Sequence, residues 1–236
     1  MFQETADEMW KSGDTNLITG DATVMDMWDF RGWTQIPQNH RLQEPEVLTP
    51  DLLNYIHKTP PKFLIQLREP VERLYSDYVF LDYGKTPNEF HQHVREAVLM
   101  MNRCLMENST RVCYFSPDLY HRLPVRIHLG CYSVFLKEWF KVFPRSAFHV
   151  TTMDEFSSDM ALTLERVMEF LGLEKLPDTQ METILKSRRR NVTKNKRGQI
   201  LPETRKLLED FYRKCSEETA ELLGDDKFLW TAKTQY

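Results

Sequence analysis

The chain has 236 residues, of which 41% are apolar and 12% aromatic, and this composition excludes a disordered or collagen-like polymer. Its 31 basic and 35 acidic side chains give a net charge of −4, which argues against a dedicated nucleic-acid-binding protein. There is no apolar run of about 18 residues, and residues 1–8 have neither a basic start nor an apolar segment, so no membrane span or signal peptide is expected in this chain.

Predicted strands and helices alternate along the chain. Short apolar segments predict strands at 16–19, 62–67 and 147–151. Apolar residues at helical spacing predict helices at 49–57, 70–78, 88–101, 132–143, 159–171 and 202–223. This alternation predicts one α/β domain over residues 1–236, with a largely parallel sheet flanked by helices. Ligands bind at the carboxyl ends of the strands in such sheets, so we expect function in the loops after Thr19, Leu67 and Thr151.

Several local features of these elements are also predicted. Residues 62–67 are nearly continuous in apolar character, which is typical of a strand buried on both faces. Thr49 and Ser158 are expected as helix N-caps, and Gly172 is expected to end a helix. Three aromatic residues of the helix at 132–143 share one face, namely Phe135, Trp139 and Phe143.

Charge is unevenly distributed along the chain. Residues 1–29 contain seven acidic side chains and one basic side chain, whereas residues 186–197 contain seven basic side chains and no acidic one. A run of like charges repels itself unless it is solvated or binds an anion. The basic run is therefore either a solvated surface loop or a site for phosphate, sulfate or an acidic polysaccharide.

The four cysteines have no CxxC spacing and no neighbouring histidine pair, so no metal site is predicted. Cys104 and Cys113 flank a short polar segment, and a disulfide between them would stabilise the fold by about 2–3 kcal/mol through chain entropy. The alternative is two free, partly buried thiols. Glycosylation sequons at Asn108 and Asn191 favour an oxidising secretory compartment.

The most informative segment has the sequence LREPVERLYSDY. Arg68 ends a predicted buried strand, a proline turns the chain directly into a helix, and Ser76 lies two turns along that helix. A guanidinium, a helix N-terminus and a hydroxyl can together bind an anion. The alternative is a surface turn in which Arg73 pairs with Glu69 or Glu72.

The pattern Arg-x-Pro-x-x-Arg-x-x-Ser after an apolar strand resembles the 3′-phosphate-binding motif of the Golgi carbohydrate sulfotransferases, which transfer a sulfuryl group from 3′-phosphoadenylyl sulfate to a sugar. Further similar segments follow in the same order, namely ITGDAT with MWD, PVR with LGCY, and DFYR. The spacing of Cys104 and Cys113 also fits the family. The resemblance covers residues 16–230. It implies a P-loop-NTPase-like sulfotransferase fold in the Golgi lumen, with the membrane anchor absent from this chain.

The resemblance also implies a reaction and a donor site. The sulfuryl group would move to the 6-hydroxyl of N-acetylgalactosamine 4-sulfate in chondroitin or dermatan sulfate, without a metal. Arg68 and Ser76 would bind the 3′-phosphate of the donor. Lys194, Lys196 and Arg197, in the basic run, would close over the nucleotide.

Two features depart from the family pattern. The base that takes the proton of the acceptor hydroxyl is a glutamate in the family, and the matching residue here is Asp21, whose alternative role is a turn or cap residue after a strand. None of the eight glycines lies in a Lys-x-Gly-Thr-Thr loop, so the chain is expected to lack the first strand and the 5′-phosphosulfate loop of the family. The alternative functions are therefore an inactive remnant that binds the nucleotide or a sulfated glycan, and a basic-loop module that binds acidic partners.

Overall fold

The structure is a computed structural model that describes residues 11, 13, 18–23, 25–187 and 198–230. The strands are β1 (Phe63–Leu67) and β2 (Phe148–Thr152). The α-helices are α2 (Thr49–Ile56), α3 (Pro70–Phe80), α4 (Pro87–Glu107), α5 (Thr110–Tyr114), α6 (Pro117–Arg122), α7 (Tyr132–Val142), α8 (Met153–Ser158), α9 (Met160–Leu171), α10 (Asp178–Lys186) and α11 (Pro202–Leu223). Short 3-10 helices are η1 (Arg31–Gln35), η2 (Pro37–Asn39), η3 (Ile127–Gly130), η4 (Arg145–Ala147) and η5 (Asp226–Leu229).

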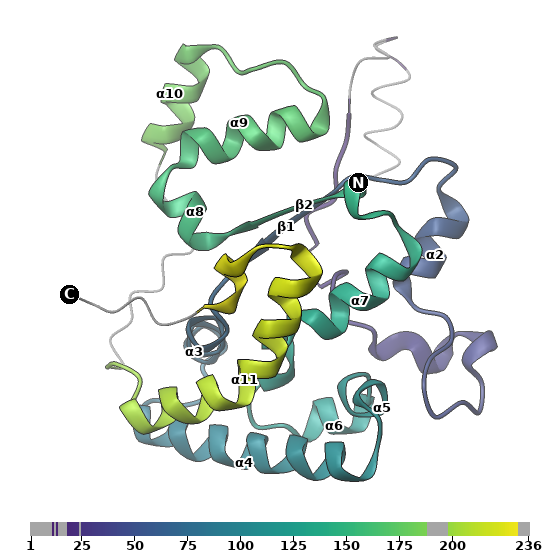
Figure 1. The fold of residues 1–236 in the computed structure, drawn as a ribbon, viewed down its shortest axis with the longest axis vertical. Helices are drawn as coiled ribbons and strands as arrows, with labels where there is room; N and C mark the ends of the chain where they lie inside the picture. The colour runs from purple at the N-terminus through teal and green to yellow at the C-terminus, as the bar shows by residue number, and fades with distance from the viewer. Residues whose placement is uncertain (1–10, 12, 14–17, 24, 188–197, 231–236) are drawn as a thin grey trace.

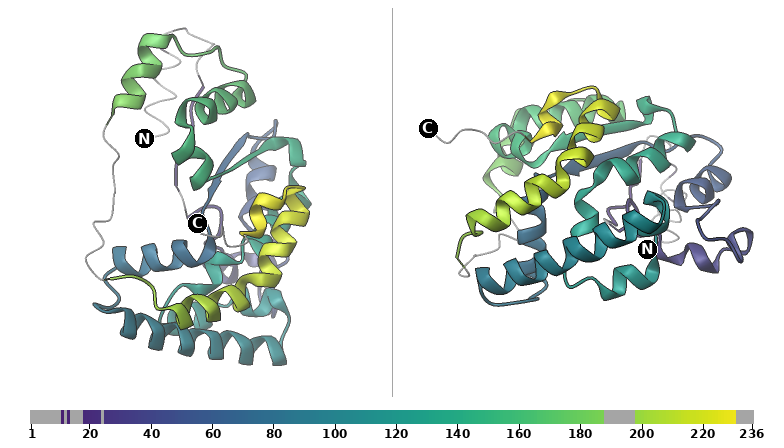
Figure 2. Two further views of the ribbon diagram at one scale, coloured as in Figure 1. Left: turned by 60° about the vertical axis from the view of Figure 1, so that its left-hand side comes forward. Right: turned by 60° about the horizontal axis from the view of Figure 1, so that its bottom comes forward.

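The two strands form a parallel pair, with Phe63 opposite Phe148 and Leu67 opposite Thr152. Parallel pairing requires a long crossover connection, and helices α3 to α7 lie between the two strands in the chain. Figure 1 and the left view of Figure 2 show the strands between α8–α10 at one end and the remaining helices at the other. The predicted α/β fold with a parallel sheet flanked by helices is confirmed.

The core is built where α7 packs on one face of this sheet. The ring of Phe63 lies 4.6 Å from that of Phe148 and 5.0 Å from that of Trp139, measured between centroids. Trp139 is 2% exposed, and its indole N–H donates to the carbonyl of Met27 at 2.9 Å. Phe135 and Phe143 are buried with it, which confirms the predicted aromatic stripe.

The opposite face of β1 is not fully covered, so the prediction of a strand buried on both faces is wrong. Leu64 is 49% exposed, and Gln66, which points to the same face, is also exposed. Helix α9 covers part of this face. The ring of Phe170 lies 5.4 Å from that of His149, the residue opposite Leu64, and the ammonium of Lys62 donates to the carbonyl of Phe170 at 2.6 Å. An apolar run indicates a strand, but it does not show what covers each face of it.

Two further predictions at element boundaries are wrong within the described residues. Ile18 and Thr19 belong to no strand, and the rest of the predicted strand at 16–19 lies outside the described residues. The N-cap of α2 is Leu48, and Thr49 is already helical. The carboxylate of Asp51 accepts the amide of Leu48 at 2.8 Å, which explains why the helix starts one residue earlier.

Helix α9 shows a similar shift at its start. Asp159 is the N-cap, with its carboxylate accepting the amide of Leu162 at 2.9 Å. Ser158 cannot serve because its hydroxyl donates instead to the carbonyl of Glu155 in the preceding helix. Gly172 ends α9 with a φ of 76°, as predicted, a conformation that glycine adopts without steric cost.

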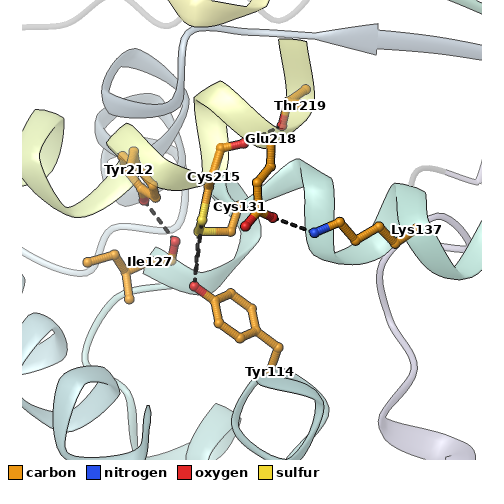
Figure 3. The surroundings of a disulfide bond; sticks show 8 residues. All are labelled: Tyr114, Ile127, Cys131, Lys137, Tyr212, Cys215, Glu218 and Thr219. Carbon is orange, nitrogen blue, oxygen red and sulfur yellow. Dashed lines mark hydrogen bonds and ion pairs between the residues drawn. A yellow bond between two sulfur atoms is a disulfide. The ribbon is translucent and has the colours of Figure 1, made fainter. Parts of the chain in front are cut away.

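Two disulfides join the helices. Cys104–Cys113 links the end of α4 to α5, which confirms the bridged alternative, and Cys131–Cys215 links the start of α7 to α11. The second disulfide was not predicted from the sequence. Figure 3 shows the hydroxyl of Tyr114 beside it, at 2.9 Å from the sulfur of Cys131.

Helix α11 packs closely on η3 next to this disulfide. The hydroxyl of Tyr212 donates to the carbonyl of Ile127 at 2.8 Å (Figure 3). A Cβ atom on Gly130 would lie 2.6 Å from the Tyr212 ring, so a side chain at this position would clash. Helices α4 and α11 are the longest, with 21 and 22 residues, but none of the described helices is both long and apolar enough to cross a membrane.

Candidate active site

The chain turns directly from β1 into α3. Pro70 is the first helical residue, where its missing N–H breaks no helical hydrogen bond. Glu69 is the N-cap, and its carboxylate accepts the amides of Val71 at 2.9 Å and Glu72 at 2.8 Å. Burial raises the pKa of Glu69, although these amides and the charge of Arg205 act in the opposite direction. An internal carboxylate therefore already occupies the helix N-terminus, which was expected to be open to a ligand.

Arg68 lies at the carboxyl end of β1, and Glu72 and Ser76 lie on the helix that follows. Arg68 directly follows β1, and its carbonyl accepts a 2.7 Å hydrogen bond from the hydroxyl of Tyr132. The Arg68 guanidinium lies 3.8 Å from the Glu72 carboxylate, which is too long for a hydrogen bond. Ser76 is half-buried one helical turn beyond Glu72. Residues four apart share a helix face, so Glu72 and Ser76 lie on one side of α3, and the side chain of Arg68, which precedes the helix, approaches that side at Glu72.

The start of α11 lies alongside α3 (Figures 1 and 2). Arg205, in the first turns of α11, forms an ion pair with the carboxylate of Glu72 and lies 3.9 Å from that of Glu69. The hydroxyl of Tyr75 on α3 donates to the carbonyl of Gly198 at 2.8 Å. Gly198 directly follows the basic run in the sequence, so the first described residue after that run is attached to α3.

Arg73 points away from this face, so the alternative in which it pairs with Glu69 or Glu72 is wrong. One of its guanidinium nitrogens lies 3.4 Å from the carboxylate of Asp77, and another donates to the carbonyl of Arg126 at 2.9 Å. The side chain of Arg126 in turn donates to Asp77 at 2.8 Å. These contacts fasten α3 to the segment that precedes η3.

A buried histidine continues this polar cluster. His128 is 5% exposed, and its Nδ1 atom has no hydrogen-bond partner among the described residues. Burial, together with the charges of Arg73, Arg126 and Arg31, lowers the pKa of His128 to about 3. The ring is therefore neutral at neutral pH, and it packs edge-on against Tyr120 at 5.2 Å between centroids.

Asp21 lies in an exposed turn. One oxygen of its carboxylate accepts both the amide and the hydroxyl of Thr23, at 2.8 and 2.7 Å. Burial and the charge of Asp21 raise the pKa of Asp26, so these two carboxylates lie near each other. Within the described residues, no hydrogen bond or ion pair joins Asp21 to Arg68. The local geometry is that of an Asx turn, and the second carboxylate oxygen is left without a hydrogen bond in this turn.

Three predicted donor-site residues, Lys194, Lys196 and Arg197, lie outside the described residues. Among the residues that the structure does describe, no group of three or more histidine, cysteine, aspartate or glutamate side chains is arranged to hold a metal ion.

Comparison with known proteins places this geometry in a family. The Sulfotransferase domain family matches residues 9–220, which include β1, α3 and the start of α11. Carbohydrate sulfotransferase 15 of Nototodarus sloanii is 32% identical over 131 residues, covering 54% of this chain and 82% of that protein. The chain belongs to the carbohydrate sulfotransferase family. Carbohydrate sulfotransferase 15 of Homo sapiens and of Rattus norvegicus are 34% and 35% identical over 220 residues, which cover 91% of this chain.

This carbohydrate sulfotransferase chain spans 39% of the length of those two mammalian relatives. A solved structure, the sulfotransferase from Alicyclobacillus acidocaldarius, covers 70% of this chain and 55% of its own, with 22% sequence identity and a TM-score of 0.43.

Sequence reasoning missed Arg205 at this site. It lies far from Arg68 in the chain, on a helix with charged residues on most faces, so its spacing does not distinguish it from the other charged residues of that helix. The signal that could have found it is its place in the first turns of the helix that directly follows the basic run. Sequence reasoning also missed the pairing of Asp77 with Arg126. Asp77 lies on α3 and Arg126 lies in the segment before η3, and two residues on separate elements form no periodic sequence pattern.

Proposed function

We propose that this chain binds 3′-phosphoadenylyl sulfate and transfers its sulfuryl group to the 6-hydroxyl of N-acetylgalactosamine 4-sulfate in chondroitin or dermatan sulfate. The observation that carries the proposal is the position of Arg68 at the carboxyl end of β1, with its guanidinium 3.8 Å from Glu72, which shares a face of α3 with Ser76. The choice of acceptor rests on 34–35% identity to proteins named carbohydrate sulfotransferase 15.

The donor's 3′-phosphate would bind between Arg68 and Ser76. A guanidinium can donate two parallel hydrogen bonds to phosphate oxygens, and a hydroxyl can donate one more. The side chain of Arg68 is 39% exposed, and within the described part of the chain its one ion pair is the 3.8 Å contact with Glu72, so its donors are available for a ligand. Lys194, Lys196 and Arg197, in the basic run that precedes Gly198, would add positive charge over the nucleotide.

In the reaction, the acceptor hydroxyl oxygen attacks the sulfur atom while the bond from sulfur to the donor's 5′-phosphate oxygen breaks. The products are a sulfate ester, adenosine 3′,5′-bisphosphate and one proton. We assign the proton to Asp21, whose carboxylate would act as the general base. Positioning and charge neutralisation carry most of the catalysis in the related phosphoryl transfers, and the same is expected for sulfuryl transfer.

The proposed site of action is the Golgi lumen. The two disulfides are compatible with an oxidising compartment of this kind. The exposed Asn108, in the first sequon, is the proposed glycosylation site among the described residues.

A second candidate function is binding of the donor nucleotide or a sulfated glycan without turnover. The observation that favours it is the lack of a Lys-x-Gly-Thr-Thr segment in the sequence, because that loop binds the donor's 5′-phosphosulfate in the resembling family. The two candidates differ in turnover and share the 3′-phosphate site.

A transfer assay separates the two candidates. The purified chain is given sulfur-labelled 3′-phosphoadenylyl sulfate with chondroitin 4-sulfate or chondroitin 6-sulfate as the acceptor. We expect label on the 4-sulfated acceptor, and at least a tenfold loss in Arg68→Ala, since one hydrogen bond to a charged group contributes about 1.5–3 kcal/mol. The control is Arg122→Ala, because Arg122 forms the same type of ion pair four residues from Asp118 on α6. Nucleotide binding without transfer would favour the second candidate, and full transfer by Arg68→Ala would contradict the donor site.

A further inference from the structure

The carboxylate of Glu72 lies where the donor's 3′-phosphate would bind. Glu72 stands between Arg68 and Ser76 along one side of α3, and its side chain is 40% exposed. Two like charges a few ångströms apart repel each other, and they do so more strongly near a protein surface than in bulk water. A charged Glu72 would therefore oppose the same phosphate that Arg68 and Ser76 would hold.

Arg205 counters that charge from the neighbouring helix. Its guanidinium hydrogen-bonds to one oxygen of Glu72, whereas Arg68 lies 3.8 Å from the other. Arg205 also lies 3.9 Å from the carboxylate of Glu69. Glu72 is thus bound by α11 and only loosely attracted by Arg68, so the Arg68 guanidinium can turn to a ligand without breaking a hydrogen bond.

The charges of this cluster balance only when Arg205 is present. Arg68 and Arg205 carry two positive charges, and Glu69 and Glu72 carry two carboxylates. Without Arg205, the cluster next to the phosphate would have one positive charge facing two carboxylates. A doubly negative phosphate would then meet a surface of the wrong sign.

We propose that Arg205 is a positioning residue of the donor site, which holds Glu72 against α11 and neutralises it so that the 3′-phosphate can bind between Arg68 and Ser76. This inference rests on the proposed donor site. It predicts that the need for Arg205 disappears when Glu72 has no charge. A residue that contacted the phosphate itself would be needed in either case.

The test is calorimetric titration of four full-length chains with adenosine 3′,5′-bisphosphate: wild type, Arg205→Ala, Glu72→Gln and the double variant. We expect Arg205→Ala to weaken binding about tenfold, which corresponds to about 1.4 kcal/mol. Glu72→Gln should tighten binding about threefold. The double variant should bind within about threefold of Glu72→Gln, because Arg205 is expected to affect binding only through the charge of Glu72. The control is Arg213→Ala, which removes another ion-paired arginine from α11, its partner being Asp210.

Three results would overturn the inference. Arg205→Ala could bind as tightly as wild type, the double variant could bind as weakly as Arg205→Ala, or Glu72→Gln could bind more weakly than wild type. The last comparison leaves Arg205 intact, so it decides the matter even if Arg205→Ala does not fold. If wild type fails to bind the nucleotide, or Arg68→Ala binds it equally well, the donor site itself is wrong and the inference falls with it. Failure of the Arg205 and Glu72 comparisons alone would leave the donor site standing.

Discussion

The two disulfides should contribute unequally to stability, because they close loops of very different length. Cys131–Cys215 joins residues 84 apart in the chain, and Cys104–Cys113 joins residues 9 apart. Cross-linking removes loop-closure entropy from the unfolded chain, which gives about 4.6 kcal/mol for the long loop and about 2.6 kcal/mol for the short one. Removing the first should therefore cost about 2 kcal/mol more than removing the second.

The comparison is between two double variants, Cys131→Ala with Cys215→Ala and Cys104→Ala with Cys113→Ala. Each pair has one buried and one half-buried cysteine, so the two double variants remove sulfur atoms of similar burial. The free energy of unfolding is measured by urea titration followed by tryptophan fluorescence. The reasoning is refuted if removal of the short-loop disulfide costs as much as removal of the long-loop one.

Three further predictions test individual residues. His128 is neutral in the folded chain and protonates near pH 6.5 in the unfolded chain, so between these pKa values the unfolded state binds one more proton. The free energy of unfolding therefore falls as the pH drops from about 6.5 towards 3, by about 1.4 kcal/mol per pH unit. Urea titrations at pH 7 and pH 5 should show a loss of unfolding free energy about 2 kcal/mol larger for wild type than for His128→Leu. In Asp21→Asn the amide oxygen can still accept a hydrogen bond from Thr23, but the side chain can no longer act as a base. The rate of sulfuryl transfer should therefore fall about 10²–10⁴-fold while nucleotide affinity is retained. A normal transfer rate would mean that Asp21 is only a turn residue. Glu69→Ala should lower the free energy of unfolding by about 1 kcal/mol through loss of the α3 cap, and Glu69→Gln by less, whereas equal urea midpoints for wild type and Glu69→Ala would show that the cap adds nothing.

The parts of the fold that local sequence determines could be predicted. An apolar run, then Arg68, then Pro70, fixes the end of β1 and the start of α3 through backbone preferences that act over a few residues. The aromatic stripe of α7 follows from helical periodicity, and the end of α9 from Gly172. These features need no knowledge of the rest of the chain.

The features that depend on distant contacts were missed or wrong. The exposure of Leu64 depends on which helices cover the sheet, and an apolar run does not contain that information. The pairing of Cys131 with Cys215 is a contact between α7 and α11, although an even cysteine count and sequons that favour an oxidising compartment could have indicated it. Arg205 acquires its place only because α11 packs beside α3. At the candidate site, therefore, the sequence indicated the proposed phosphate ligands Arg68 and Ser76, but not the charge of Arg205 that α11 brings next to Glu72.

The central claim is that Arg68 at the end of β1 forms the 3′-phosphate site, and it is tested most directly by calorimetric titration of the purified chain with adenosine 3′,5′-bisphosphate. We expect saturable binding by wild type and by Arg122→Ala, and a loss of affinity of at least tenfold in Arg68→Ala, since one hydrogen bond to a charged group contributes about 1.5–3 kcal/mol. Equal affinity in Arg68→Ala, or no binding by a wild-type chain whose circular dichroism shows it to be folded, would contradict the account.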